Sequence, residues 1–201
     1  MSNEFLFKTI KTSSEGLFKD RGSKFIAYAY RVLNEDDFKS AMSEVKEIHP
    51  TARHFCYAYR IGLNGEDYRV NDDGEPSGSA GQPILNQLRS LELTNLGVIV
   101  VRYFGGTKLG VPGLINAYKE ATLEAINENE VIQDELRKEY EIYFQYALMN
   151  DIMTLVKKND LFVLEQKFDV TCYIKLGVPC SFIEHFESFL GDKSGLELKT
   201  L

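Results

Sequence analysis

The sequence predicts an α+β protein of two domains, and three observations support this class. The chain has 201 residues, which is enough for two small domains. Apolar runs of strand length alternate with segments of helical periodicity along the whole chain. A polar segment, Asn-Glu-Asn-Glu at 127–130, interrupts this alternation and has the composition of a hinge. We therefore expect one domain over residues 1–130 and a second over residues 131–201.

The first half of the N-terminal domain predicts a strand, a helix and a hairpin. Residues 24–33 are rich in aromatic and aliphatic side chains, as strands are. Asn34 is a good N-cap residue, and the apolar residues after it recur at helical spacing. Residues 54–63 and 67–70 form two extended runs joined by Asn64-Gly65. Because this dipeptide is the preferred centre of a two-residue turn, the two runs predict a β-hairpin.

The second half of this domain alternates glycine-rich turns with apolar elements. Residues 72–83 are rich in glycine and lead into a short helix over 84–91. Residues 97–103 are almost wholly apolar, which is typical of a strand covered on both faces. A second glycine-rich turn at 105–113 precedes a long amphipathic helix that continues to residue 126.

The C-terminal domain predicts the element order βαββαβ. The expected elements are a strand at 138–148, a helix at 151–158, strands at 161–167 and 170–176, a helix at 181–190 and a strand at 196–201. This order is that of the ferredoxin-like, or split βαβ, fold.

The composition excludes several classes of protein. The net charge of −7 argues against coating nucleic acid by charge alone, but residues 1–127 carry only −1 of it, which permits a local basic patch. The three cysteines lack the spacing of a disulfide framework or a zinc site. No apolar run approaches the length of about eighteen residues that a membrane span needs. We therefore expect a soluble cytoplasmic protein with no membrane partner.

The first glycine-rich turn supports three interpretations. It could be a turn whose serines cap the next helix and whose acids are solvated. It could bind a phosphate or carboxylate through the N–H groups at the helix start, in the segment Ser77, Gly78, Ser79, Ala80 and Gly81. It could hold a divalent cation on carboxylate oxygens, although the spacing of the acids Asp72, Asp73 and Glu75 does not match an EF-hand.

The second glycine-rich turn favours binding over nucleotide hydrolysis. Thr107 precedes Lys108 and Leu109 follows it, whereas a P-loop needs the order Gly-Lys-Ser/Thr. The turn does combine cations and rings, which suit phosphates and stacked bases. With Lys24 from an earlier turn, the predicted nucleic-acid or partner-binding residues are Lys24, Arg102, Tyr103 and Lys108.

Four segments in order resemble the signature blocks of the IMPACT family: residues 20–25, 52–60, 72–83 and 101–110. The resemblance covers roughly residues 18 to 127, and the βαββαβ tail looks like the small domain of bacterial members. It implies that the first domain has the ribosomal-protein-like, left-handed βαβ fold of domain four of elongation factor G. It also implies that the tail resembles the last domain of that factor.

The resemblance also implies a function. Eukaryotic IMPACT proteins modulate translation by competing for an activator of a stress-responsive initiation-factor kinase, and the elongation-factor likeness implies RNA or ribosome contact. No catalytic residue, metal or cofactor is implied. The leading hypothesis is therefore a non-enzymatic, cytoplasmic protein that binds RNA or a ribosomal or translation-factor partner. The alternative is a nucleotide- or phosphate-binding enzyme that uses the Ser77–Gly81 loop with magnesium.

Overall fold

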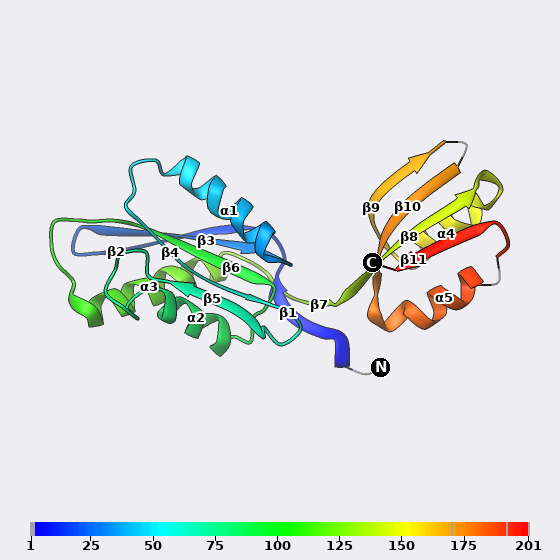
Figure 1. The fold of residues 1–201 in the computed structure, drawn as a ribbon. Helices are drawn as coiled ribbons and strands as arrows, with labels where there is room; N and C mark the ends of the chain where they lie inside the picture. Colours follow the sequence, from blue (N-terminus) through cyan, green and yellow to red (C-terminus); the bar gives the residue numbers. More distant parts are fainter. Residues whose placement is uncertain (1–2, 170, 192, 201) are drawn as a thin grey trace. The chain divides into compact units, whose positions relative to one another are not determined.

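The structure is a computed structural model that describes residues 3–169, 171–191 and 193–200 (Figure 1). Its contacts divide the chain into an N-terminal domain, Leu6–Asp134, and a C-terminal domain, Glu135–Leu201 with Met1–Phe5. Both domains mix helices and strands, so the predicted α+β class with two domains is confirmed. The described residues do not include Val170 and Leu201, which are limits of predicted strands, or the first two residues of the predicted first domain.

The N-terminal domain is built on a sheet with the strand order β2-β3-β6-β4-β5, in which every neighbouring pair is antiparallel. Its strands are β2 (Ser14–Asp20), β3 (Ser23–Arg31), β4 (His54–Ile61), β5 (Asp67–Asn71) and β6 (Leu96–Tyr103). The central strand β6 is buried from Leu96 to Arg102, as its nearly continuous apolar sequence predicts.

Helices cover both faces of this sheet. On one face lies α1 (Glu35–Ile48), which packs Phe38, Ala41 and Val45 against tyrosine, isoleucine and valine side chains. On the other face lie α2 (Gly81–Ser90) and α3 (Gly110–Asn127), which enclose the larger core (Figure 1). The side chain of Asn34 accepts a hydrogen bond from the Asp37 N–H at 2.8 Å, so Asn34 caps α1 as predicted.

Three strands and the end of one predicted run differ from the sequence predictions. The edge strand β2 was not predicted, and neither were β1 (Leu6–Ile10) and β7 (Val131–Glu135), which pair with each other as a separate two-stranded sheet. The hairpin of β4 and β5 is present, but its ladder ends at the pair Ile61–Asp67. The predicted hairpin is thus present, and the first predicted run extends two residues beyond the end of β4. Two glycines in this longer loop, Gly62 and Gly65, adopt positive φ.

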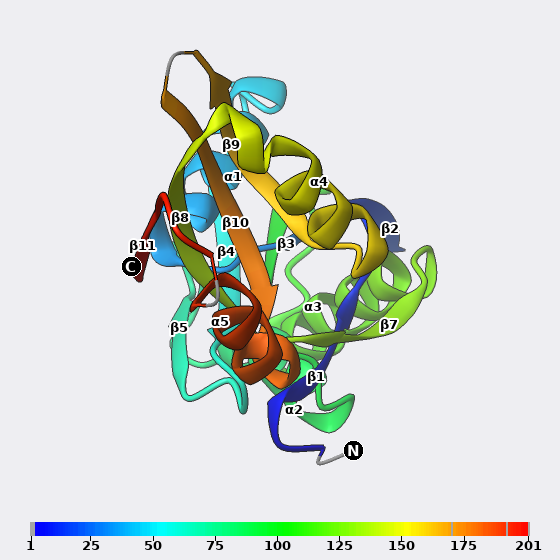
Figure 2. The same ribbon diagram turned by 90° about the vertical axis from the view of Figure 1, so that its right-hand side faces the viewer.

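The C-terminal domain has the predicted βαββαβ order. Its strands are β8 (Arg137–Gln145), β9 (Phe162–Phe168), β10 (Thr171–Pro179) and β11 (Leu196–Thr200), arranged β11-β8-β10-β9 with antiparallel neighbours. The helices α4 (Met149–Lys158) and α5 (Ile183–Gly191) lie on one side of the sheet and form the core with it (Figure 2). Short 3-10 helices occur at Asn3–Phe5, Tyr146–Leu148 and Cys180–Phe182. No helix in the described part of the chain combines the length and apolarity needed to traverse a bilayer.

Candidate functional site

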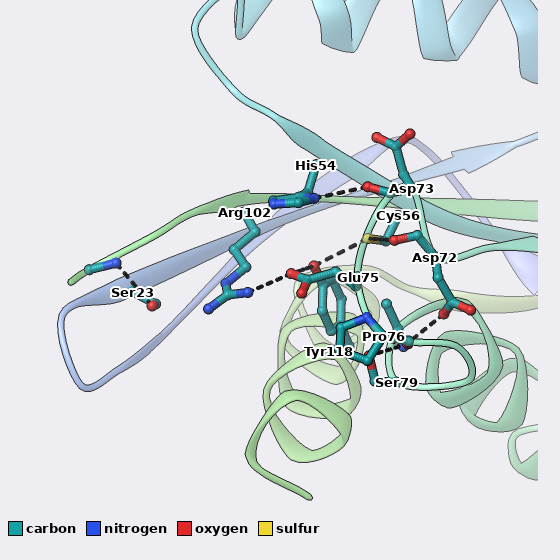
Figure 3. A network of polar contacts seen from close by, with 12 residues as sticks. Ser23, His54, Cys56, Asp72, Asp73, Glu75, Pro76, Ser79, Arg102 and Tyr118 are labelled. Atoms are coloured by element: carbon teal, nitrogen blue, oxygen red, sulfur yellow. Dashed lines mark hydrogen bonds and ion pairs between the residues drawn. The ribbon is translucent and has the colours of Figure 1, made fainter. Parts of the chain in front are cut away.

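The first glycine-rich turn connects β5 to α2 through two consecutive tight turns (Figure 3). The N–H of Glu75 donates to the carbonyl of Asp72 at 2.9 Å, and the N–H of Ser79 donates to the carbonyl of Pro76 at 3.0 Å. Asp73 has φ 40° and Gly74 has φ 86°, so the first turn requires left-handed backbone. The loop is therefore held by its own backbone.

The carboxylate of Asp72 fills the predicted anion site. Its oxygens accept hydrogen bonds from the N–H groups of Gly78 at 2.8 Å, Ala80 at 3.0 Å and Gly81 at 2.8 Å. Ser79 is buried and donates its hydroxyl to the Pro76 carbonyl at 2.6 Å, while Ser77 is exposed. Because two N–H groups at the start of α2 and one in the preceding loop already bind an anion of the chain itself, an external phosphate would have to displace Asp72.

The other two acids of this turn also have internal partners. An Asp73 oxygen accepts from the Phe55 N–H at 2.6 Å, and Glu75 accepts from Arg102 at 2.6 Å and from the Tyr118 hydroxyl at 2.9 Å. Among the residues that the structure describes, no three His, Cys, Asp or Glu side chains are grouped so that they could hold a metal ion. Asp72, Asp73 and Glu75 thus all accept hydrogen bonds from groups of the protein itself.

Glu75 belongs to a buried polar network on the face of the sheet that α2 and α3 cover (Figure 3). Its partner Arg102 has a side chain that is 8% exposed, and the guanidinium lies over the rings of Phe25 and Phe104 at 5.4 and 5.5 Å. The Cys56 sulfur lies 3.2 Å from the Tyr118 hydroxyl oxygen. Burial raises the pKa of both Cys56 and Tyr118 far above their ordinary values, so neither is an activated nucleophile.

Arg102 and Tyr103, predicted to act on one binding face, project to opposite faces of the sheet. They are consecutive residues of β6, and successive side chains of a strand alternate. The Tyr103 hydroxyl contacts Nδ1 of His49 at 2.9 Å, on the side of α1, and His49 contacts the Tyr28 hydroxyl at 2.8 Å. Arg102 is therefore a buried structural cation, whereas Tyr103 lies on the face of the sheet that α1 covers, with His49 and Tyr28.

Lys24 lies on the same face as Tyr103, in a row of cations at the end of the sheet. It stands directly opposite Tyr103 on one side and Lys19 of β2 on the other. Both lysines are exposed, and neither makes an ion pair with any described residue. The first residue of β4, His54, is opposite Arg102. The exposed Arg53 precedes it and therefore lies next to Tyr103, where it continues the row.

The second glycine-rich turn packs on the β2–β3 turn at the same end of the sheet. The Gly105 N–H donates to the Ser23 hydroxyl at 3.1 Å, and a Cβ at Gly105 would lie 1.9 Å from a backbone atom of Gly22. Lys108 is exposed in this turn, and Arg21 is exposed in the other. We call the five exposed cations at this end the basic tip: Lys19, Arg21, Lys24, Arg53 and Lys108.

The sequence prediction found two residues of the basic tip and missed three. Lys24 and Lys108 were predicted, because each borders a glycine-rich turn. Lys19, Arg21 and Arg53 were missed, and the pairing that places Lys19 opposite Lys24 could not be used because β2 itself was not predicted. Arg102 was predicted as a phosphate contact, and the structure places it in the core with Glu75 instead.

Comparisons with known proteins agree with this architecture. The Impact N-terminal domain model matches residues 21–126. The IMPACT family member YvyE of Bacillus subtilis is 31% identical over 94% of this chain and 89% of its own length. A solved structure titled "Crystal structure of an hypothetical protein" has a TM-score of 0.72 and 25% identity, covering 98% of both chains.

A second solved structure covers less of the chain. It is that of the two-domain translational regulator Yih1, with a TM-score of 0.40 and 24% identity over 59% of this chain and 48% of its own. The family model spans more than half of this chain, and the Bacillus subtilis relative is similar along nearly all of it. The chain therefore belongs to the IMPACT family.

Proposed function

We propose that this protein is a non-enzymatic binding protein that modulates translation by contacting RNA of the translation machinery through the basic tip. Membership of the IMPACT family supports the translational part of the proposal, because a role in translation is what the resemblance to this family implies. The filled helix start at Asp72 and the high pKa of Cys56 support binding rather than catalysis.

The pairing of Lys19 with Lys24 is the observation that carries the RNA part. Like charges directly opposite each other on neighbouring strands destabilise a sheet. These two ammonium groups have no described carboxylate to relieve the repulsion. A phosphate backbone would relieve it, and the release of counterions would add to the affinity.

Two rings at the tip add a means of contacting bases. Tyr103 lies between Lys24 and the extension of β4, and Phe104, at the end of β6, is 58% exposed. An exposed ring beside cations, such as that of Phe104, is what single-stranded RNA contacts by stacking, whereas Tyr103 is half-buried against His49. Arg102 has a supporting role here, since its guanidinium lies against the Phe104 ring. The first glycine-rich turn contributes Glu75, which pairs with Arg102 and so holds the guanidinium that contacts Phe104.

Charge reversal at the tip tests the proposal. In a binding titration with a ribosomal RNA fragment, Lys24→Glu should lower the affinity by about tenfold or more and reduce the salt slope by about 1. The matched control is Lys157→Glu, which makes the same change of charge at an exposed lysine of α4. If both variants weaken binding equally, or neither does, the basic tip is not the RNA-binding surface.

A further inference from the structure

The strand β9 is one edge of the C-terminal sheet, and within the described residues no strand pairs with its outer side (Figure 1). All seven residues of β9 are exposed, whereas the neighbouring strand β10 contributes buried residues to the core. Four of the exposed side chains are large and apolar, and each is 37–61% exposed: Phe162, Val163, Leu164 and Phe168. An exposed apolar edge strand offers its unpaired backbone N–H and C=O groups to another strand.

Charged side chains alternate in sign along one row across the outer face of this sheet, the face opposite α4 and α5. Lys199 of β11 is directly opposite Glu141 of β8. Glu141 is also opposite Lys175 of β10, which in turn is opposite Glu165 of β9. Opposite charges at facing positions stabilise neighbouring strands. The row is therefore balanced within the domain and ends at the open edge with the Glu165 carboxylate, so a strand added there should place a cation beside Glu165.

The strand β9 itself carries a cation at the matching position. Lys167 lies two residues beyond Glu165, so the two side chains share a face of the strand. A two-fold axis that relates two antiparallel strands keeps each residue on its own face, so the pair must be centred on one residue. A centre at Gln166 places each Glu165 opposite Lys167 of the second copy, which continues the alternation of charge. A centre at Glu165 would instead place two carboxylates directly opposite each other.

The same register brings apolar side chains together on the opposite face of the strand. With the centre at Gln166, Leu164 of one copy lies opposite Phe168 of the other, and these side chains are 45% and 44% exposed in the single chain. A register shift interrupts the β9–β10 ladder at Leu164, so regular pairing is confined to residues 164–168. Charged residues on an edge usually prevent pairing, but here their order makes the strand complementary to itself. The short ladder predicts a dimer that dissociates on dilution.

We infer that this protein forms a two-fold symmetric dimer through β9, in which two antiparallel β9 strands join the C-terminal sheets of two copies. The interface is isologous, because the same residues of both copies meet around the axis. Its attraction comes from two equivalent Glu165–Lys167 pairs and two Leu164–Phe168 contacts, in addition to backbone hydrogen bonds. The inference does not rest on the basic tip or on RNA binding, so dimerisation is tested on the full chain without RNA.

Sedimentation equilibrium of the full-length protein over a range of concentrations measures this association. The wild-type protein should show a reversible monomer–dimer equilibrium. Glu165→Lys and Lys167→Glu each turn both charge pairs into like-charge pairs, so each variant alone should raise the dissociation constant of the dimer by about tenfold or more. An equimolar mixture of the two variants restores opposite charges in both pairs, and it should form a heterodimer with an affinity close to that of the wild type.

The matched control is Lys157→Glu, which makes the same change of charge at an exposed lysine of α4 and should change the dissociation constant by less than about twofold. Glu165→Lys also places a lysine opposite Lys175 in its own sheet, so thermal unfolding of each variant checks that the fold is intact. A wild-type protein that stays monomeric at its highest soluble concentration would overturn the inference. Unchanged association in Lys167→Glu would place the interface elsewhere, and two folded variants that fail to associate when mixed would refute the charge pairing.

Discussion

Replacing Glu75 with leucine removes the only carboxylate that the described structure pairs with the buried Arg102 guanidinium. The two side chains are 4% and 8% exposed, and the Glu75 and Arg102 atoms that pair are 2.6 Å apart. Breaking a buried ion pair from one side costs about 3–5 kcal/mol, because the remaining charge stays buried without compensation. We therefore expect Glu75→Leu to lower the free energy of unfolding by this amount and Tm by roughly 10 °C.

Urea unfolding followed by circular dichroism measures this loss, and a double variant isolates its cause. In Glu75→Leu/Arg102→Met both charges are replaced by apolar side chains, so most of the lost stability should return. The exposed pair of Lys8 and Glu92 provides the control, and Glu92→Leu should leave the unfolding midpoint almost unchanged. If the double variant is as unstable as Glu75→Leu alone, an uncompensated buried charge is not the source of the loss.

Three further outcomes are expected, each measured by urea unfolding. Asp72→Ala should cost about 1–2 kcal/mol, because the start of α2 loses its N-cap acceptor. Gly78→Ala should cost about 1–2 kcal/mol from backbone strain alone, because Gly78 has φ 75° and no atom lies within 4 Å of the new Cβ. Gly81→Ala should cost more, because its Cβ would lie 2.7 Å from the Asn71 nitrogen. Equal costs at the two glycines would contradict the packing argument. Burial lowers the pKa of His49 below its ordinary value of 6.5, so the unfolded chain binds a proton at His49 more readily than the folded protein does. The free energy of unfolding should therefore fall as the pH drops below 6.5, and His49→Gln should flatten this dependence.

Local patterns predicted most of the elements, because a strand such as β6 and a helix such as α1 carry their own periodicity and cap. The strands that escaped prediction depend on partners far away in the sequence. β1 and β7 have only five residues each, and each has its partner about 120 residues away. In β2, the buried Gly16 lies against the backbone of Ala125 in α3, a close approach that no local pattern reveals.

The candidate site was predicted in part for a similar reason. The glycine-rich turns and their cations are visible in the sequence, so Lys24 and Lys108 could be predicted as exposed cations. The role of Asp72 depends on a loop that brings its carboxylate back to N–H groups six to nine residues later. Strand parity alone separates Arg102 from Tyr103, and applying it would have placed them on opposite faces. The pairing of Arg102 with Glu75 depends on tertiary structure and has no local signal.

The pairing of β1 with β7 bears on how the chain acquires its fold during synthesis. Residues 6–10 leave the ribosome about 120 residues before the strand that completes their sheet, which ends at Glu135. At about 5–20 residues per second, the first strand waits roughly 6–25 s for its partner to be translated. Throughout that interval the backbone N–H and C=O groups that β1 pairs with β7 are open to other strands, although the Lys8 carbonyl has an earlier partner in the Thr94 N–H. Truncation of a nascent chain before Val131 should therefore leave the first strand accessible to protease, and extension past Glu135 by enough residues to clear the exit tunnel should protect it.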